Sequence, residues 1–321
     1  MKKVTWNKVI ALAIVLAVTL CIPAMGFNDY IMTIFVQSLL YSIIVLGLNF
    51  ITGMTGQMNL GNAAVFGLGA YTAALTTTKL GISPWVAMLL VIVMGWLIGQ
   101  LLGYPSLRVQ GVYLTLTTIA FNEIVRLCLQ NMSWTGGVGG VRNIPRFNLF
   151  GLEIKTPTQN FYFILAILIV FIVISHRFIH SKYGRAFIAV RDNVDAVETC
   201  GIKLSRIKVQ AFTLSTIFGA FAGGLYAHFM GYISPQTFTT NLSMSFAVML
   251  IIGGRCSIAG CIIGAFVIAF APELLRFLGT YYQAVYALII MLALIFNPNG
   301  LVALGPKIKK LFQKREKSAK A

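Results

Sequence analysis

Residues 84–104 read PWVAMLLVIVMGWLIGQLLGY, a run without a charged side chain. A helix needs about 20 mostly apolar residues to cross the hydrocarbon core of a bilayer. Gly95, Gly99 and Gly103 recur at every fourth position, so they lie on one helical face where a second helix can approach closely in lipid. The stretch therefore predicts a membrane-spanning helix that packs tightly against a neighbour.

Runs of the same kind fill most of the chain. The segment 9–25 is interpreted as an uncleaved first helix rather than a secretory signal, because many more apolar runs follow it. The eighth run is short for a full crossing, so we expect about ten transmembrane helices, with a range of 8–10. The predicted spans are residues 9–25, 30–52, 63–78, 84–104, 112–131, 161–180, 209–230, 242–253, 261–278 and 282–296.

The composition indicates the same class of protein. The 321 residues are 58% hydrophobic and 10% charged, and the mean hydropathy is +0.84. An average soluble domain carries about 25% charged residues, and disordered chains lack the apolar and aromatic residues that are abundant here. We attribute the net charge of +17 to basic residues retained on the cytoplasmic side of a membrane rather than to nucleic-acid binding. The sequence predicts an all-α polytopic membrane protein.

The basic residues also predict the orientation. The segment 181–208, between spans six and seven, holds six Lys or Arg against three acids, and the tail from Lys307 onward is basic. If the N-terminus, this segment and the tail all face the cytoplasm, six spans must be followed by four, which is the number that hydropathy gives. We therefore expect the N-terminus and the C-terminus to be cytoplasmic.

One transmembrane domain accounts for residues 1–304. The loop 133–159 should then be extracytoplasmic, and the segment 181–208 should lie in the cytoplasm as a short amphipathic helix with flanks. Neither is long enough to form a separate domain. Residues 305–321 are predicted to be a basic cytoplasmic tail that lies near anionic lipid.

The common motifs of catalysis and metal binding are absent from the sequence, namely GxxxxGK[ST], GxSxG and HExxH. His176 and His180 are four residues apart, but they lack the glutamate and lie at a predicted helix end, where His and Arg side chains reach the interface. The five cysteines contain no CxxC pair. We expect no catalytic residue, no metal site and no cofactor in this chain.

Glycine-rich polar sequence at membrane depth is the first candidate for a functional site. Residues 52–62 read TGMTGQMNLGN, and residues 253–260 read GGRCSIAG after a span that runs in the same direction. Irregular backbone within a bilayer is tolerated only where protein or a water-filled cavity surrounds it, and broken helices often frame a substrate path. We expect broken or re-entrant segments at both places; for the first, an ordinary cytoplasmic loop is the alternative.

Span five carries ionisable residues inside the predicted membrane. Glu123 and Arg126 are three residues apart, and Thr115, Thr118 and Asn122 share a face with Arg126. Because charges in hydrocarbon are costly, this face should meet protein or water. Two interpretations stay open: a polar lining of a path, or a self-satisfied pair that holds helices together.

These stretches carry a resemblance to a known family. Residues 56–71, GQMNLGNAAVFGLGAY, resemble the GQxSLGxAAFxGxGAY stretch of the branched-chain amino acid permeases of binding-protein-dependent ABC importers, in their LivM-like branch. Residues 107–126, 181–202 and 296–301 match further stretches, so the resemblance extends over about 41–301. Asn59 stands where serine is usual and Asn62 where histidine is frequent, and Asn297 and Asn299 also depart from the pattern.

The resemblance implies a transport subunit of a bacterial-type cytoplasmic (inner) membrane. In such importers an extracytoplasmic solute-binding protein delivers the solute to a pair of similar permeases, here this chain and a second, LivH-like permease. Two ATPase subunits on the cytoplasmic face bind ATP and drive the import of leucine, isoleucine and valine. The residues expected along the translocation path are Gln57, Asn59, Asn62, Asn122 and Glu123.

The segment 181–208 resembles the coupling loop of the family. Its small and apolar residues are predicted to enter a groove on an ATPase, and its charged residues to set the register. The apolar stripe consists of Ala186, Val190, Val194, Val197 and Gly201. The coupling residues are Gly184, Arg185, Arg191, Asp192, Glu198 and Gly201. Charge reversal at Arg185 or Arg191 is expected to weaken ATPase binding.

Other functions stay open at this point. On the outer side, Arg142, Arg146 and Lys155 are expected to contact an acidic rim of the binding protein. Neighbours within the family handle urea or short amides, so the solute is not decided. An ion-coupled secondary transporter, and a passive channel or structural membrane protein, are the other classes; the coupling-like segment argues against both.

Overall fold

The computed structural model describes residues 23, 28–109, 111–149, 152–154, 156–296 and 300–303. Nearly all of the predicted first span lies outside the described residues, as do the basic tail 305–321 and Lys155, Asn297 and Asn299. The regular secondary structure of the described residues is helical apart from one short hairpin and one isolated β-bridge. The predicted all-α class is thereby confirmed.

The predicted spans two to ten each coincide with one helix. Five stretches of the described chain are long and apolar enough to cross a bilayer: Asp29–Met54, Pro84–Leu107, Val112–Asn131, Pro157–Ile179 and Leu204–Met230. The molecule is therefore a polytopic membrane protein. The nine helices are α2 (Asp29–Leu48), α3 (Asn62–Thr78), α4 (Pro84–Gly103), α5 (Val112–Asn131), α6 (Pro157–Ile179), α9 (Leu204–Met230), α10 (Thr240–Gly253), α11 (Ile258–Leu274) and α12 (Tyr282–Phe296).

The segment 181–208 forms two short helices before α9 begins, where the sequence predicted one. They are α7 (Lys182–Asp192) and α8 (Val194–Thr199). Asn193 separates them, because its backbone is extended (φ −159°, ψ 109°) and its side-chain oxygen accepts the backbone N–H of Ala196 at 3.0 Å. Asn is a preferred N-cap for this reason, so the cap of α8 ends α7.

The remaining elements are short. The strands β1 (Asn148–Leu149) and β2 (Leu152–Glu153) form an antiparallel hairpin that the sequence did not predict, since two-residue strands leave no periodic pattern. A π-helix, η2 (Asn49–Met54), continues α2. The 3₁₀ turns are η3 (Pro105–Leu107), η4 (Ser133–Thr135), η5 (Gly137–Gly139), η6 (Pro235–Thr237), η7 (Arg276–Tyr281) and η8 (Leu301–Ala303).

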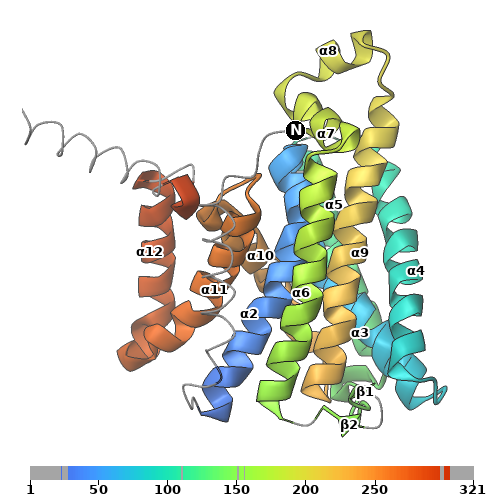
Figure 1. Ribbon diagram of the computed structural model, residues 1–321, viewed down its shortest axis with the longest axis vertical. Helices are drawn as coiled ribbons and strands as arrows, with labels where there is room; N and C mark the ends of the chain where they lie inside the picture. The colour runs from blue at the N-terminus through green and yellow to red at the C-terminus, as the bar shows by residue number, and fades with distance from the viewer. Residues whose placement is uncertain are drawn as a thin grey trace, which may run out of the picture.

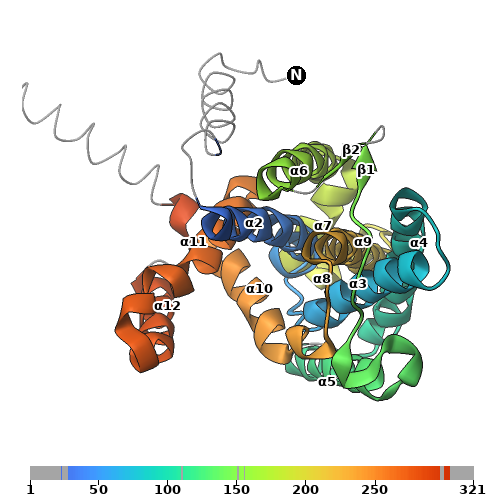
Figure 2. The ribbon, with the colours of Figure 1, turned by 90° about the horizontal axis from the view of Figure 1, so that it is seen from below.

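Helix α9 occupies the centre of the bundle, and the glycine face of α4 packs against it (Figure 2). A Cβ atom added to Gly95, Gly99 or Gly103 would lie 2.5–3.1 Å from a Cα atom of α9. Real Cβ contacts of 2.5 Å do not occur, so Gly99 in particular lets the two backbones approach. The packing interpretation of this glycine face is confirmed.

Two further glycine faces do the same for other helix pairs. Gly219 and Gly223 of α9 face α3, and a Cβ on Gly219 would lie 3.2 Å from Val65 Cγ1. Gly260 and Gly264 of α11 face α10. In lipid, where apolar burial does not drive helices together, such close backbone contact supplies the van der Waals attraction.

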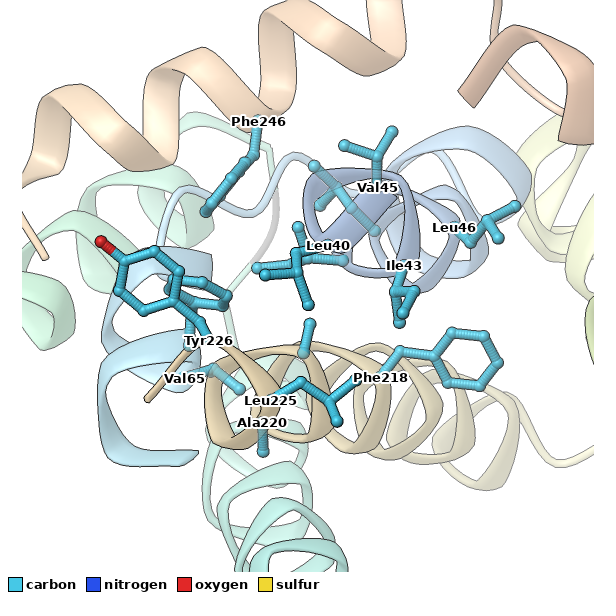
Figure 3. Close-up of a cluster of buried hydrophobic side chains, with 14 of the residues drawn as sticks. Leu40, Ile43, Val45, Leu46, Val65, Phe218, Ala220, Leu225, Tyr226 and Phe246 are labelled. Carbon is cyan, nitrogen blue, oxygen red and sulfur yellow. The ribbon is translucent and has the colours of Figure 1, made fainter. Parts of the chain in front are cut away.

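The apolar core forms where α2, α3, α9 and α10 meet (Figure 3). Leu40 and Ile43 of α2 are fully buried and lie beside Phe218 and Leu225 of α9 and Phe246 of α10. Helix α2 is apolar all round, as expected for a helix that other helices enclose.

The bundle has two distinct ends (Figure 1). Helices α7 and α8 lie at one end, here called the α7 end, and the β1–β2 hairpin lies at the opposite end, here called the hairpin end. Both views place α12 at the edge of the molecule, beyond α11. The two long polar segments of the sequence thus emerge at opposite ends, as predicted.

Candidate functional site

Helical structure is interrupted between α2 and α3, at the α7 end of the bundle, and we call this interruption, residues 56–61, the break. After η2, residues 56–61 adopt no regular structure, and Gly56 has a left-handed backbone (φ +74°) that glycine accepts without strain. Thr52 Oγ1 donates to the carbonyl of Gln57 at 3.0 Å and ties the segment back to η2. Asn59 is buried, whereas the neighbouring Met58 is 40% exposed, so other parts of the protein enclose the segment only partly.

The first turn of α3 begins inside the protein, where its backbone N–H groups have no partners within the helix. Four side chains supply acceptors, three from helices α5 and α10 and one from the loop itself. The bonds are Leu60 N to Thr118 Oγ1 (3.1 Å), Gly61 N to Asn59 Oδ1 (2.9 Å), Ala63 N to Ser243 Oγ (2.8 Å) and Ala64 N to Asn122 Oδ1 (2.6 Å). We call the group formed by Asn59, Asn62, Thr118, Asn122 and Ser243 the polar junction.

The polar junction brings together helices that are far apart in the sequence. Asn122 lies on α5 and Ser243 on α10, and Ser243 Oγ also donates to Asn122 Oδ1 at 3.3 Å. The sequence identified Asn59, Asn62 and Asn122 as members of one site, and the structure places all three at the start of α3. Ser243 was missed, because it is one of several polar residues in the stretch 239–245, TTNLSMS.

Several amide atoms at this place have no hydrogen-bond partner among the described residues. They are the side-chain Oε1 of Gln57, Nδ2 of Asn59 and Oδ1 of Asn62, all buried. A buried polar atom is nearly always bonded, so each exception calls for an explanation. Gln57, Asn59 and Asn62 lie within six residues of one another, so the free donor and acceptors are concentrated beside the break.

Glu123 lies apart from the polar junction. Its carboxylate pairs with Arg126 on the same helix, with Arg126 Nε 3.1 Å from both carboxylate oxygens, and Arg126 Nη1 also donates to Gln130 at 2.9 Å. The predicted self-satisfied pair is present, but it lies within α5 and joins no two helices. The predicted lining of Thr115, Thr118, Asn122 and Arg126 divides. Thr118 and Asn122 face the start of α3, whereas Arg126 pairs with Glu123, whose side chain is 43% exposed.

Helices α7 and α8 are positioned by two glycines of the predicted coupling set. A Cβ on Gly184 would lie 2.5 Å from the carbonyl oxygen of Phe178, so only glycine lets α7 fold back on the end of α6. Gly201 ends α8 with φ +74° and donates to the carbonyl of Glu198 at 2.9 Å. The side chains of Arg185, Asp192 and Glu198 are exposed.

The predicted apolar stripe for a partner is wrong in part. Val190 and Val197 are 3% and 4% exposed, and Phe187 is fully buried. The ring of Phe187 lies 5.2 Å from that of Phe178 at the end of α6. These side chains therefore anchor α7 and α8 to their own bundle. Of the stripe, Val194 and Gly201 are exposed.

Arg191 points toward the bundle, which the sequence did not reveal. Its Nη1 donates to the carbonyl of Gly53 at 3.3 Å and lies 3.0 Å from Cys256 Sγ. Its Nε and Nη2 donate to Asp192 Oδ1, and this bond raises the pKa of the Arg191 guanidinium above its ordinary value. The contact joins α7 to both glycine-rich segments of the sequence.

The hairpin end carries exposed basic side chains. Arg142 lies over the ring of Tyr232, with its Cζ 5.6 Å from the ring centroid. Lys79 Nζ donates to the carbonyl of Trp134 at 2.5 Å, and Val141 pairs with Ile233 in a β-bridge. Arg142 and Arg146 are exposed, so this end presents positive charge on loops that are held in place.

Comparison with known proteins identifies the family. The family described as "Branched-chain amino acid transport system / permease component" matches residues 30–296. The chain belongs to this family. The matched region covers the break, the polar junction, α7, α8 and α12 of the permease.

Named relatives of the permease are transport proteins rather than enzymes. The high-affinity branched-chain amino acid transport system permease protein LivM of Salmonella typhimurium is 33% identical, over 85% of this chain and 70% of the relative. LivM of Escherichia coli K12 is 32% identical over the same shares. LivH of Salmonella typhimurium is 25% identical, over 84% of this chain and 93% of the relative. No solved structure matches the permease.

Proposed function

We propose that the permease is the membrane-spanning subunit of an ABC importer that translocates leucine, isoleucine and valine. An extracytoplasmic binding protein delivers the solute, and two separate ATPase subunits bind the ATP, so this chain needs no cofactor. A second, LivH-like permease completes the pathway. Both LivM and LivH are named as permease proteins of branched-chain amino acid transport systems, which supports a pair of related chains.

The helix pair α7–α8 is the observation that carries this proposal. It buries Phe187, Val190 and Val197 in its own bundle and leaves charged side chains exposed at the end of the molecule (Figure 1). Exposed charges of both signs set register and partner choice more than raw affinity. A rigidly anchored, charged helix pair at one end of a membrane bundle suits docking of a soluble ATPase.

The orientation belongs to the same proposal. We place the α7 end in the cytoplasm and the hairpin end outside, with ten spans in residues 1–304, both termini inside and the basic tail 305–321 near the inner leaflet. The membrane is the cytoplasmic (inner) membrane of a bacterial-type cell. The exposed Arg142 and Arg146, with Lys155, then face an acidic rim of the binding protein.

The translocation path is proposed to pass beside the polar junction. Side-chain amides offer both donors and acceptors without net charge, so Gln57, Asn59 and Asn62 suit the ammonium and carboxylate groups of a zwitterion. Their unpartnered atoms supply the capacity for such contacts. Asn122 holds the start of α3 in place, and the Glu123–Arg126 pair on the outer face of α5 supplies further polar surface.

The first test is uptake of labelled leucine and labelled urea in cells with and without the gene. We expect loss of leucine uptake without the gene, its restoration by the gene, and its abolition when ATP is depleted while ion gradients are maintained. Loss of urea uptake alone would keep the ABC mechanism and change the solute. Uptake that follows an ion gradient instead would indicate a secondary transporter, and uptake without an energy source a channel.

A second test addresses the path. The double variant Gln57→Ala/Asn59→Ala should lower leucine uptake by about tenfold, because loss of a hydrogen bond to a charged group costs roughly that much. The complex should still assemble with its ATPases. Gln236→Ala/Asn241→Ala removes the same two residue types from exposed positions and serves as the control. Wild-type uptake by the first variant would exclude these residues from the path.

A further inference from the structure

A single carbonyl oxygen joins three segments at the α7 end. The carbonyl of Gly53, in the π-helix η2, accepts from Arg191 Nη1 at 3.3 Å and from Cys256 Sγ at 3.0 Å. Cys256 belongs to the glycine-rich turn between α10 and α11, and Arg191 lies near the end of α7. Arg191 Nη1 and Cys256 Sγ are themselves 3.0 Å apart, so the three groups form a closed triangle.

The turn that carries Cys256 is held in an unusual conformation. Cys256 has φ +61°, a left-handed backbone that non-glycine residues seldom adopt. Its backbone N–H donates to Asn49 Oδ1, at the start of η2, at 2.8 Å. Strained backbone of this kind persists only where its surroundings hold it, and it recurs at switch regions. Burial raises the pKa of the Cys256 thiol, which keeps it a hydrogen-bond donor to Gly53.

The aliphatic part of Arg191 meets the other side of the break. A Cβ added to Gly56 would lie 2.9 Å from Arg191 Cγ. Arg191 therefore touches Gly53 on η2 with its guanidinium and Gly56 on the extended segment with its methylene groups. Gly56 precedes Gln57 directly, and Asn59 follows two residues later. One side chain on α7 contacts both ends of the turn that leads to the polar junction.

We infer that Arg191 is a positioning residue that transmits movement of α7 and α8 to the two glycine-rich segments, through its shared contact with Gly53, Cys256 and Gly56. The inference rests on the proposed function, because it assigns the movement to an ATPase docked on α7 and α8. It also changes the expectation for Arg191 itself: its side chain is 38% exposed, but its guanidinium bonds Gly53 within the permease, whereas Arg185 remains the arginine assigned to a partner.

The physical reason is that a partner shifts a conformational equilibrium only by its different affinity for the two states. An ATPase that moves α7 must therefore change contacts between α7 and the path. π-helical segments are frequent at functional sites. In η2, the backbone carbonyl of Gly53 accepts a hydrogen bond from Arg191. Displacement of α7 removes the contacts of Arg191 with Gly53 and Gly56 together. The movement then reaches the start of α3 through the segment 56–61.

The experiment uses the full complex with its ATPases, second permease and binding protein, reconstituted in vesicles. Arg191→Met keeps the methylene contact with Gly56 and removes the guanidinium. Arg185→Met is the matched control, since Arg185 is exposed on the same helix and donates to the carbonyl of His180 at 3.2 Å. Solute uptake, ATP hydrolysis and ATPase co-purification are measured for each.

We expect Arg191→Met to retain the ATPases and to hydrolyse ATP, but to import about tenfold less solute per ATP hydrolysed, as for loss of one charge-assisted hydrogen bond. Arg191→Lys, whose single ammonium cannot bond Gly53 and Asp192 together as the fork of arginine does, should recover part of the coupling. Arg185→Met should instead weaken ATPase retention and leave the import per ATP unchanged.

Thiol labelling distinguishes a local release of Cys256 from general destabilisation, because general unfolding would also expose the buried Cys261. In a background with Cys21, Cys128 and Cys200 replaced by serine, Cys256 and the fully buried Cys261 are left. A maleimide should modify Cys256 faster in Arg191→Met than in wild type and at the wild-type rate in Arg185→Met. The variant Cys256→Ser, in which only Cys261 is left, measures how much of the labelling comes from Cys261.

Each outcome decides a separate point. Wild-type coupling and wild-type labelling in Arg191→Met would overturn the inference, and so would loss of the ATPases from that variant, since Arg191 would then be a partner contact. If the wild-type permease binds no ATPase, the proposed function fails. The labelling rate of Cys256 in Arg191→Met still shows whether Arg191 holds the turn.

Discussion

Asn122 shows how much of the site depends on one side chain. Its Oδ1 accepts the backbone N–H of Ala64 at 2.6 Å and the hydroxyl of Ser243 at 3.3 Å, and the residue is fully buried. Asn122→Ala would leave both donors buried without this acceptor, which costs about 1–3 kcal/mol. We expect a lower thermal unfolding temperature of the purified permease. Asn131→Ala, on the same helix but exposed and bonded to the Leu127 carbonyl, should change it little; equal effects would contradict this role.

Individual site residues were predictable from the sequence where a polar side chain stands among apolar neighbours. Asn59, Asn62 and Asn122 were identified in this way, and the structure gathers them at the start of α3. The inward direction of Arg191 was not predictable, because Cys256 lies 65 positions along the chain. Such contacts follow from how helices cross, which hydropathy does not encode.

Among the elements, the α4–α9 contact depends most clearly on residue size. A Cβ on Gly99 would lie 2.5 Å from Thr213 Cα and from Thr216 Oγ1. Gly99→Leu should therefore separate the helices at a cost of about 3 kcal/mol or more, since overpacking is itself destabilising. We expect little monodisperse permease in detergent. Gly139→Leu adds the same side chain where nothing lies within 4 Å, and it should behave as wild type. Equal yields of the two variants would contradict the close contact.

Some element boundaries were predictable from the ends of the apolar runs, but the capped starts of α6 at Pro157 and of α11 at Ile258 were placed too late, at 161 and 261. The predicted span 112–131 coincides with α5, and α4 begins at Pro84 as expected. The split of α7 from α8 was missed, because it depends on a cap made by Asn193 within an amphipathic pattern. The hairpin was missed because its strands are two residues long.

At the scale of the whole molecule, α6 alone joins the loop 133–159 to α7 and α8, so these segments lie at opposite ends of the bundle (Figure 1). Hydropathy predicted this separation, and it also predicted more spans than the five long apolar stretches that the described chain contains. Helices α3, α10 and α11 are shorter because broken or glycine-rich segments adjoin them.

The proposed orientation rests on the distribution of charge and is open to direct measurement. Basic residues are retained on the cytoplasmic side, and the segment 181–208 carries six of them, so the α7 end should face inward. Val138→Cys at the hairpin end and Val194→Cys on α8 place single thiols at exposed positions in a cysteine-free background. An impermeant maleimide should label Val138→Cys in right-side-out vesicles and Val194→Cys in inside-out vesicles. The reverse pattern would place α7 and α8 outside, where no ATP-driven subunit could dock, and would overturn the importer proposal together with the topology.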